Sequence, residues 1–277
     1  MLTTWTVLKS GIKKLQLAGV ENPLWETRVI AAHVLGIQTT DTFDQLSFSA
    51  QKEESFFSLV NRRCSGEPLQ YVIGCWDFYG REFLLSPSVL IPRPETEQLI
   101  DIVLEQTLPD SPSILDVGTG SGAVGITLAL EIPDSNVTGT DISSEAVKQA
   151  QENAMLLHAK NFTAVTDDLA SGQPGPFHVI TANLPYVPSG ELPGLQGEVR
   201  DHEPHLALDG GDNGTSLILR MVEQSLGLTV SGSFLILETD CTHEESVPAF
   251  FQRHYWKRVG THRDLAGRHR FVSAVRR

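Results

Sequence analysis

Cysteine is scarce in this sequence, and long apolar runs are missing. The three cysteines, Cys64, Cys75 and Cys241, are far apart in the 277-residue chain and odd in number. This spacing argues against a disulfide framework and a zinc site, and it is typical of a reducing compartment. The longest apolar runs, such as Phe234 to Leu237, fall far short of the roughly 20 residues that span a bilayer. The N-terminus has no basic cap before an apolar stretch, so we expect a cytoplasmic protein without a secretory signal or membrane-spanning segment.

Basic side chains are also few, with 21 Lys and Arg against 34 Asp and Glu, and the net charge of −13 is unevenly spread. Residues 86–252 carry a balance of −19, and residues 253–277 one of +7. An acidic middle repels a phosphate backbone, so a general nucleic-acid binder is disfavoured. We interpret the basic C-terminal stretch as a solvated face of a terminal hairpin.

The composition, 40% apolar and 20% charged, is ordinary for a globular protein, and the length predicts one large domain or two unequal ones. Apolar residues recur at helical spacing over 7–17, 24–35 and 56–60, and Asn22 and Pro23 offer a cap and a first-turn proline for the second of these helices. Alternating and aromatic runs over 70–76 and 81–85 suggest a hairpin. Prolines then mark a linker, which places the domain boundary near residues 85–93.

After the linker, short apolar runs alternate with helical segments. Expected strands cover residues 113–117, 136–140, 162–165, 178–182 and 233–238, and expected helices include 123–130 and a helix capped by Ser143. This alternation predicts an α/β fold with a parallel sheet and right-handed crossovers. Residues 256–260 and 270–275 flank a polar turn, as an antiparallel pair would.

A glycine-rich loop is the strongest local signal. Asp116 to Gly122 reads Asp-Val-Gly-Thr-Gly-Ser-Gly, lies between an expected strand and helix, and is followed by Asp141 at the end of the next strand. Glycines let a ligand approach the backbone closely, and an acidic residue at the next strand end can accept hydrogen bonds from a ribose diol. A dinucleotide fold or a ligand-free turn fits the loop alone. Asp116 could face a cationic ligand or the loop's own amides.

A second signal is the tetrad Asn183 to Tyr186, Asn-Leu-Pro-Tyr, directly after an expected strand. Strand carboxyl ends line the ligand crevice of an open α/β sheet, so the tetrad should share a site with the glycine loop. The Asn183 side-chain oxygen and the Leu184 carbonyl can each accept an N–H from a planar –NH2 group. The Tyr186 ring can lie against the same group. Taken without the glycine loop, the tetrad is better interpreted as an ordinary polar turn.

Together these motifs resemble class I S-adenosylmethionine-dependent methyltransferases that act on –NH2 nitrogens. Three flanking runs, residues 62–71, 89–97 and 203–211, look like the PrmC/HemK family of peptide chain release factor glutamine methyltransferases. The resemblance covers almost the whole chain. It implies a seven-stranded, mostly parallel sheet in a methyltransferase domain, residues 86–277. It also implies a helical substrate-recognition domain with a linking hairpin, residues 1–85.

The resemblance also implies roles for single residues. The methionine part of S-adenosylmethionine would lie against the glycine loop, whose residues are Gly118, Thr119, Gly120, Ser121 and Gly122. Asp141 would bind the ribose, and Asp168 and Leu169 would lie near the adenine. The tetrad Asn183, Leu184, Pro185 and Tyr186 would bind the glutamine amide, with Asn183 and Tyr186 catalytic and Asn183 also touching the cofactor. Leu184 stands where the family usually has a second proline, which keeps the carbonyl acceptor but puts loop rigidity in question.

The resemblance implies N5 methylation of the glutamine in the Gly-Gly-Gln loop of release factors, by a monomer that contacts neither nucleic acid nor membrane. An adenine-N6 DNA or RNA methyltransferase is the alternative, but it needs a basic groove. A nicotinamide oxidoreductase lacks an identifiable acid–base pair here, and a non-catalytic module would not need both motifs. The densest group of acidic and histidine residues spans 201–205, and Pro204 interrupts it, so we expect no metal. Arg93 and Glu95 are expected to form a linker salt bridge.

Overall fold

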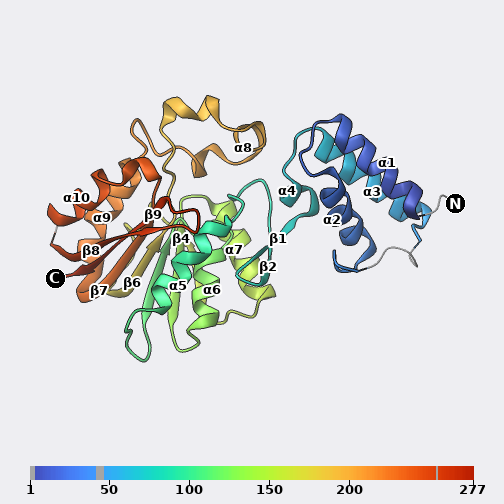
Figure 1. Ribbon diagram of the computed structural model, residues 1–277. Coiled ribbons are helices and arrows are strands. Elements are labelled where there is room, and N and C mark those ends of the chain that lie inside the picture. The colour runs from blue at the N-terminus through green and yellow to red at the C-terminus, as the bar shows by residue number, and fades with distance from the viewer. Residues whose placement is uncertain (1–3, 42–46, 254) are drawn as a thin grey trace. The chain divides into compact units, whose positions relative to one another are not determined.

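The computed structural model describes residues 4–41, 47–253 and 255–277, and their contacts divide the chain into two compact units (Figure 1). Unit 1 comprises Met1–Cys75 and Gln196–His202, and unit 2 comprises Trp76–Leu195 and Glu203–Arg277. Residues 1–3, part of the N-terminus for which we expect no secretory signal, lie outside the described part. The division falls at Cys75, so residues 76–85, which the sequence analysis placed with the helical domain, group with unit 2.

Unit 1 is built from helices. They are α1 (Thr4–Leu17), α2 (Pro23–Leu35), α3 (Ala50–Cys64), α4 (Leu69–Ile73) and α8 (Gly197–His202). Pro23 stands in the first turn of α2 as expected, although the Asn22 side chain makes no capping hydrogen bond. Gly11 allows α1 to pack closely on α3, because a Cβ there would lie 2.6 Å from the Phe56 ring. The first three helices run side by side in blue in Figure 1.

The hairpin is shorter than the sequence suggested. Residues 70–73, expected as part of a strand, belong to α4, which Pro68 precedes and Gly74 ends in the left-handed conformation. A single helical turn buries Leu69 and Val72 together, and side chains three residues apart share a helix face but not a strand face. The hairpin itself consists of β1 (Cys75–Phe78) and β2 (Arg81–Leu84).

Unit 2 contains a seven-stranded sheet in the order β5-β4-β3-β6-β7-β9-β8. The strands are β3 (Ser113–Val117), β4 (Asn136–Asp141), β5 (Phe162–Thr166), β6 (Phe177–Ala182), β7 (Thr229–Glu238), β8 (Trp256–Arg263) and β9 (His269–Arg276). The first five strands of that order pair in parallel, and β9 pairs antiparallel with β7 and β8. The mostly parallel sheet with a terminal antiparallel pair is thus confirmed.

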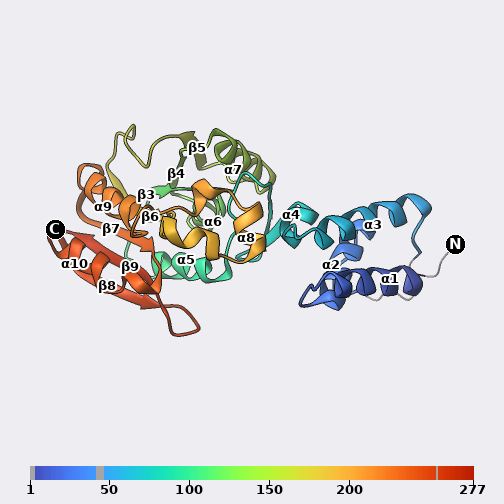
Figure 2. The ribbon, with the colours of Figure 1, turned by 90° about the horizontal axis from the view of Figure 1, so that it is seen from above.

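Helices cover both faces of this sheet. They are α5 (Glu97–Leu104), α6 (Ala123–Glu131), α7 (Ser144–Leu156), α9 (Ser216–Leu228) and α10 (Ser246–Arg253), with short 3₁₀ turns at η1 (Pro94–Thr96), η2 (Ser189–Gly194), η3 (His205–Ala207) and η4 (Cys241–His243). Ile114 of β3 packs in the core under α5, α6 and α7, and its neighbour Leu115 packs under α9 and α10. Figure 2 shows α5 and α9 on opposite sides of the strands. No described helix is both long and apolar enough to cross a bilayer.

The strand register brings the two sequence motifs to one edge of the sheet. Val117, the last residue of β3, pairs with Thr140 of β4 and with Ala182 of β6. The glycine loop, Asp141 and Asn183 therefore begin from three adjacent strand ends, which is where open α/β sheets bind ligands. Ser143 caps α7 as expected, accepting a hydrogen bond from the backbone of Ala146.

Candidate active site

A cavity of about 470 Å³ lies within unit 2 at these strand ends. Its walls come from the β3–α6 loop, the end of β4, the segments after β5 and β6, the 88–96 linker and residues 204–220. A volume of roughly 300–1,000 Å³ is usual for a small-molecule site. Ten of the expected site residues line it: Gly118, Thr119, Gly120, Ser121, Asp141, Asp168, Leu169, Asn183, Leu184 and Pro185. Gly122 and Tyr186 do not.

The glycine loop is held by the strand it leaves and by the next one. The backbone amides of Gly118 and Thr119 both donate to the Thr140 carbonyl, at 2.8 and 2.9 Å. Buried Asp116 accepts hydrogen bonds from the Thr119 hydroxyl at 2.7 Å and from the Gly125 amide at 3.1 Å. Burial raises the pKa of the Asp116 carboxyl. Asp116, expected to face a cationic ligand or the loop's own amides, thus binds a loop hydroxyl and an amide of α6, and it also accepts from the Thr181 hydroxyl at 2.8 Å.

The three loop glycines all have positive φ, but their surroundings differ. A Cβ on Gly120 would meet no atom within 4 Å, which leaves its backbone open to a ligand in the cavity. A Cβ on Gly122 would lie 2.5 Å from Cδ1 of Ile126 and 3.2 Å from Cβ of Ala150. Gly122 therefore permits close packing at the start of α6, and its contact with the cofactor remains a prediction.

Asp141 holds the loop and still faces the cavity. Its Oδ2 accepts from the Gly120 amide and its Oδ1 from the Ser143 amide, each at 2.9 Å. Each carboxylate oxygen has a second acceptor position, so hydroxyl donors of a ligand can bind the same side chain. Burial raises the pKa of Asp141, although the backbone donors oppose the shift.

The segment after β5 supplies another wall. Leu169 is buried with φ near +55°, and its carbonyl accepts a 2.6 Å hydrogen bond from the Thr140 hydroxyl. Asp168 forms an ion pair with Arg220 of α9, and both residues line the cavity. Arg220 could not be predicted from the sequence, because no local pattern distinguishes it from other helical cations. Ile142 also lines the cavity and was not predicted, although an apolar residue directly after a strand-end acid is a signal that the sequence offers.

The tetrad packs directly against the glycine loop. Leu184 is buried, and a Cβ on Gly118 would lie 3.1 Å from its Cδ2 and 3.4 Å from the Asn183 carbonyl oxygen. The leucine thus fills space beside the loop glycine, which gives the tetrad a packing contact in place of the proline ring. The Asn183 side chain lines the cavity and donates from Nδ2 to the Thr96 hydroxyl at 3.4 Å.

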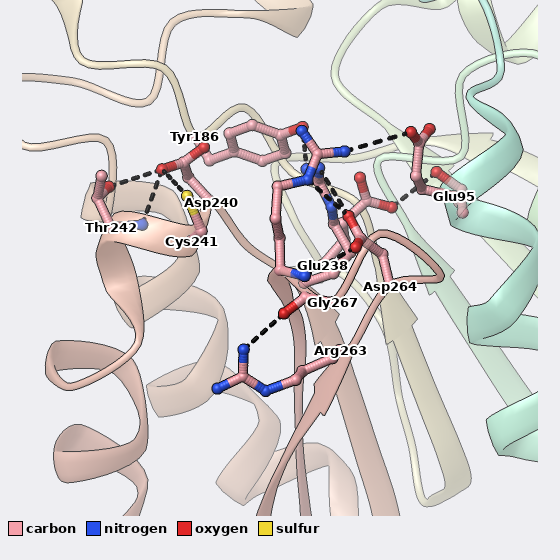
Figure 3. Close-up of polar contacts among 12 residues, drawn as sticks. Glu95, Tyr186, Glu238, Asp240, Cys241, Thr242, Arg263, Asp264 and Gly267 are labelled. Carbon is pink, nitrogen blue, oxygen red and sulfur yellow. Dashed lines mark hydrogen bonds and ion pairs between the residues drawn. The ribbon is translucent and has the colours of Figure 1, made fainter.

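Tyr186 belongs to a neighbouring polar cluster. Arg270 donates to its hydroxyl at 3.4 Å, and Figure 3 shows the ring directed towards a group that includes Glu238, Asp264 and Glu95. Burial and the nearby Glu238 carboxylate raise the pKa of Tyr186 to about 12, so the phenol is protonated at neutral pH. A substrate contact by the Tyr186 ring remains a prediction.

The charged linker residues Arg93 and Glu95 pair with residues outside the linker and not with each other. Arg93 pairs with the buried Glu203 at 2.6 Å, and Glu95 lies 3.7 Å from Arg268. The expected salt bridge between Arg93 and Glu95 is replaced by these two longer-range pairs. Among the described residues, no group of three or more His, Cys, Asp or Glu side chains is arranged to hold a metal ion.

Comparison with known proteins places the chain among methyltransferases. The PrmC N-terminal domain model matches residues 6–74, and the Methyltransferase small domain model matches residues 96–193. A release factor glutamine methyltransferase of Koribacter versatilis (strain Ellin345) is 39% identical over 241 residues, 86% of either chain. Another, of Moorella thermoacetica (strain ATCC 39073 / JCM 9320), is 35% identical over 100% of this chain and 99% of its own. A solved methyltransferase of Pyrococcus furiosus shares the fold, with a TM-score of 0.53 at 16% identity over 82% of this chain and 98% of its own.

Proposed function

Because the chain belongs to the release factor glutamine methyltransferase family, we propose that it transfers a methyl group from S-adenosylmethionine to the side-chain amide nitrogen of the glutamine in the Gly-Gly-Gln loop of release factors. The observation that carries the proposal is the shared cavity. It combines a glycine loop and strand-end acid suited to a nucleoside with an Asn-Leu-Pro segment suited to a planar –NH2 group.

The cavity residues fit S-adenosylmethionine. Asp141 offers acceptor positions for ribose hydroxyls beyond those used by its backbone donors, Gly120, Ser143 and Ile142. The open space above Gly120 admits the methionine part, and Leu169 with Asp168 bounds the place for the adenine. When bound, S-adenosylmethionine supplies a methyl group on a positively charged sulfur, which leaves as a neutral thioether with the electron pair of the broken S–C bond.

The tetrad can orient the acceptor nitrogen. The Asn183 Oδ1 atom and the Leu184 carbonyl each accept one N–H of the glutamine amide, so that its nitrogen lone pair is directed at the methyl group. A neutral amide is a poor nucleophile, and positioning supplies much of the rate enhancement in such a case. A new C–N bond forms, and the nitrogen loses one proton to solvent as or after the methyl group arrives. The product is an N-methyl amide, with no covalent enzyme intermediate.

We assign substrate selection to the helical domain, proposed as residues 1–85, and methyl transfer to residues 86–277. A single Gly-Gly-Gln loop buries much less than the roughly 800 Å² per partner of a standard interface, so contacts elsewhere on the release factor must add area. We propose a cytoplasmic monomer that contacts neither nucleic acid nor membrane. The relatives that match along both units are named for release factors, which disfavours the adenine-N6 alternative.

Replacing the orienting acceptor tests the mechanism. Asn183→Ala should lower turnover on purified release factor by about 100-fold or more, because an amide that is poorly oriented loses most of the benefit of proximity. Tyr186→Phe keeps the ring and loses only a long hydrogen bond to Arg270, so its turnover should fall far less. Transfer of labelled methyl groups under saturating S-adenosylmethionine measures both variants. Near-normal turnover in Asn183→Ala would contradict the assigned role.

A further inference from the structure

A chain of two hydrogen bonds connects Asn183 to a buried carboxylate. The Asn183 Nδ2 atom lies 3.4 Å from Oγ1 of Thr96, and that hydroxyl donates to Oε2 of Glu238 at 2.7 Å. Thr96 ends η1 and is 3% exposed, and Glu238 ends β7 and is 1% exposed. Three segments far apart in the sequence thus meet behind the side chain that faces the substrate.

The donor and acceptor roles in these two hydrogen bonds set the orientation of the Asn183 amide. A threonine hydroxyl has one proton, and Thr96 gives it to Glu238, so its oxygen can only accept from Asn183. Only the Nδ2 end of the amide can donate that bond, which leaves Oδ1 available to accept from a group in the cavity that Asn183 lines. The reversed amide would turn Nδ2 towards the substrate –NH2, and two donors would then face each other.

We propose that Thr96 and Glu238 are positioning residues, which hold the Asn183 side chain with its oxygen towards the substrate amide while the Glu238 carboxylate is ionised. The proposal rests on the function proposed above and adds two residues to it. Neither touches the reacting atoms in this account, and both act through Asn183.

The protonation state of Glu238 decides which atoms donate and which accept in these two hydrogen bonds. A protonated Glu238 donates to Thr96 Oγ1, the threonine proton is then free to turn towards Asn183 Oδ1, and the amide reverses. The ionisable side chains around Glu238 come from the linker, the tetrad and the strand β9: Arg93, Glu95, Tyr186 and Arg270. Asp240 acts on Tyr186, and Asp264 lies 3.5 Å from Arg270 (Figure 3).

The residues around Glu238 place the ionisation of its carboxyl group near neutral pH. Burial raises the pKa of Glu238 to about 7 and Glu95 adds to the rise, while the Thr96 hydrogen bond, Arg270 and Arg93 oppose it. The carboxylate is therefore mostly ionised above pH 7 and mostly protonated below it. Turnover should rise with pH through this region and level off above it.

The hydroxyl is tested first. Thr96→Val removes the acceptor for Asn183, and we expect turnover on release factor to fall by about 10- to 100-fold, as misplaced catalytic groups do. The KM for S-adenosylmethionine should change little. Thr96→Ser restores the hydroxyl and should restore most of the turnover. Thr127→Val is the matched control, since Thr127 is equally buried in α6 and, among the described residues, its hydroxyl has no hydrogen-bond partner.

The carboxylate is tested by the pH profile. Glu238→Gln cannot ionise, so the rise of kcat near pH 7 should disappear, and combining it with Thr96→Val should cost less than the sum of the two single changes. A rise that persists in Glu238→Gln, additive effects, or a Thr96→Val enzyme as active as Thr127→Val would each overturn the positioning role. If the wild-type enzyme transfers no methyl group to release factor, the proposed function and this inference both fail. If it does and only the variants disagree, this inference alone fails.

Discussion

Asp141 shows at the scale of a single residue what sequence can and cannot establish. Its place at the end of the expected strand that follows the glycine loop was sufficient to predict a ligand-facing acid at the end of β4. Its bonds to the Gly120 and Ser143 amides were not predictable, because they depend on the exact dihedral angles of the loop. The same holds for Asn183, whose link to Glu238 joins residues 55 positions apart.

Asp141→Asn should weaken S-adenosylmethionine binding by about 1.5–3 kcal/mol, the usual value of one hydrogen bond to a charged group. The substitution keeps one acceptor for the loop but removes the charge that strengthens the ribose contacts. Titration calorimetry measures the affinity directly. Asp134→Asn changes an exposed acid before β4, at the other end of that strand, and should leave the affinity unchanged. Equal affinities in both variants would remove the ribose assignment.

At the scale of elements, the sequence identified those whose ends carry strong signals. β3 begins and ends where the apolar run over 113–117 does, and Ser143 caps α7 as expected. The short helix α4 was missed because its apolar residues also fit an alternating strand, and only Pro68 and Gly74 mark its ends. The assignment of the hairpin to unit 2 follows from tertiary contacts, since Phe78 and Phe83 are buried in that unit's core.

Asn153 connects the hairpin to the glycine loop through hydrogen bonds that no sequence pattern predicts. From α7 its Oδ1 accepts from the Leu84 amide at 2.8 Å, and its Nδ2 donates to the carbonyls of Leu84 and Ser121 at 3.0 and 2.8 Å. Asn153 is fully buried, so its removal leaves buried backbone groups without partners.

We therefore expect Asn153→Ala to lower the free energy of unfolding by about 1–3 kcal/mol for each backbone group left unpaired. Lys148→Ala, at an exposed position of the same helix, should change it by less than about 0.5 kcal/mol. Urea unfolding followed by circular dichroism compares the two. A loss as small in Asn153→Ala as in the control would show that water or repacking replaces these bonds.

At the scale of the whole molecule, the chain returns to unit 1 after the tetrad. Arg63 of α3 pairs with Glu26 of α2 at 2.5 Å and with Glu198 of α8 at 2.6 Å. Arg63 and Glu26 are buried, and the Glu198 side chain is 46% exposed. A residue 135 positions away thus supplies a second carboxylate to Arg63, and no local pattern in the sequence predicts this contact.

Arg63→Met should destabilise the protein by about 3–5 kcal/mol, because it leaves the Glu26 carboxylate buried without a cation. Arg62→Met is the neighbouring control. Arg62 is 42% exposed and pairs with Glu67, and an exposed ion pair of this kind contributes roughly 0–1 kcal/mol. Thermal unfolding of the two variants at equal concentration measures the difference. Similar melting temperatures would show that the buried pair adds nothing beyond its packing.

The central claim is methyl transfer to a release-factor glutamine, and peptide mapping tests it most directly. Purified enzyme is incubated with labelled S-adenosylmethionine and purified release factor, with and without added nucleic acid, and the digested factor is mapped by mass spectrometry. A matched factor carries asparagine in place of the glutamine of the Gly-Gly-Gln loop. We predict one labelled methyl group on the side-chain nitrogen of that glutamine and none on the asparagine form. Label on another residue, on added nucleic acid only, or on neither factor would contradict the claim.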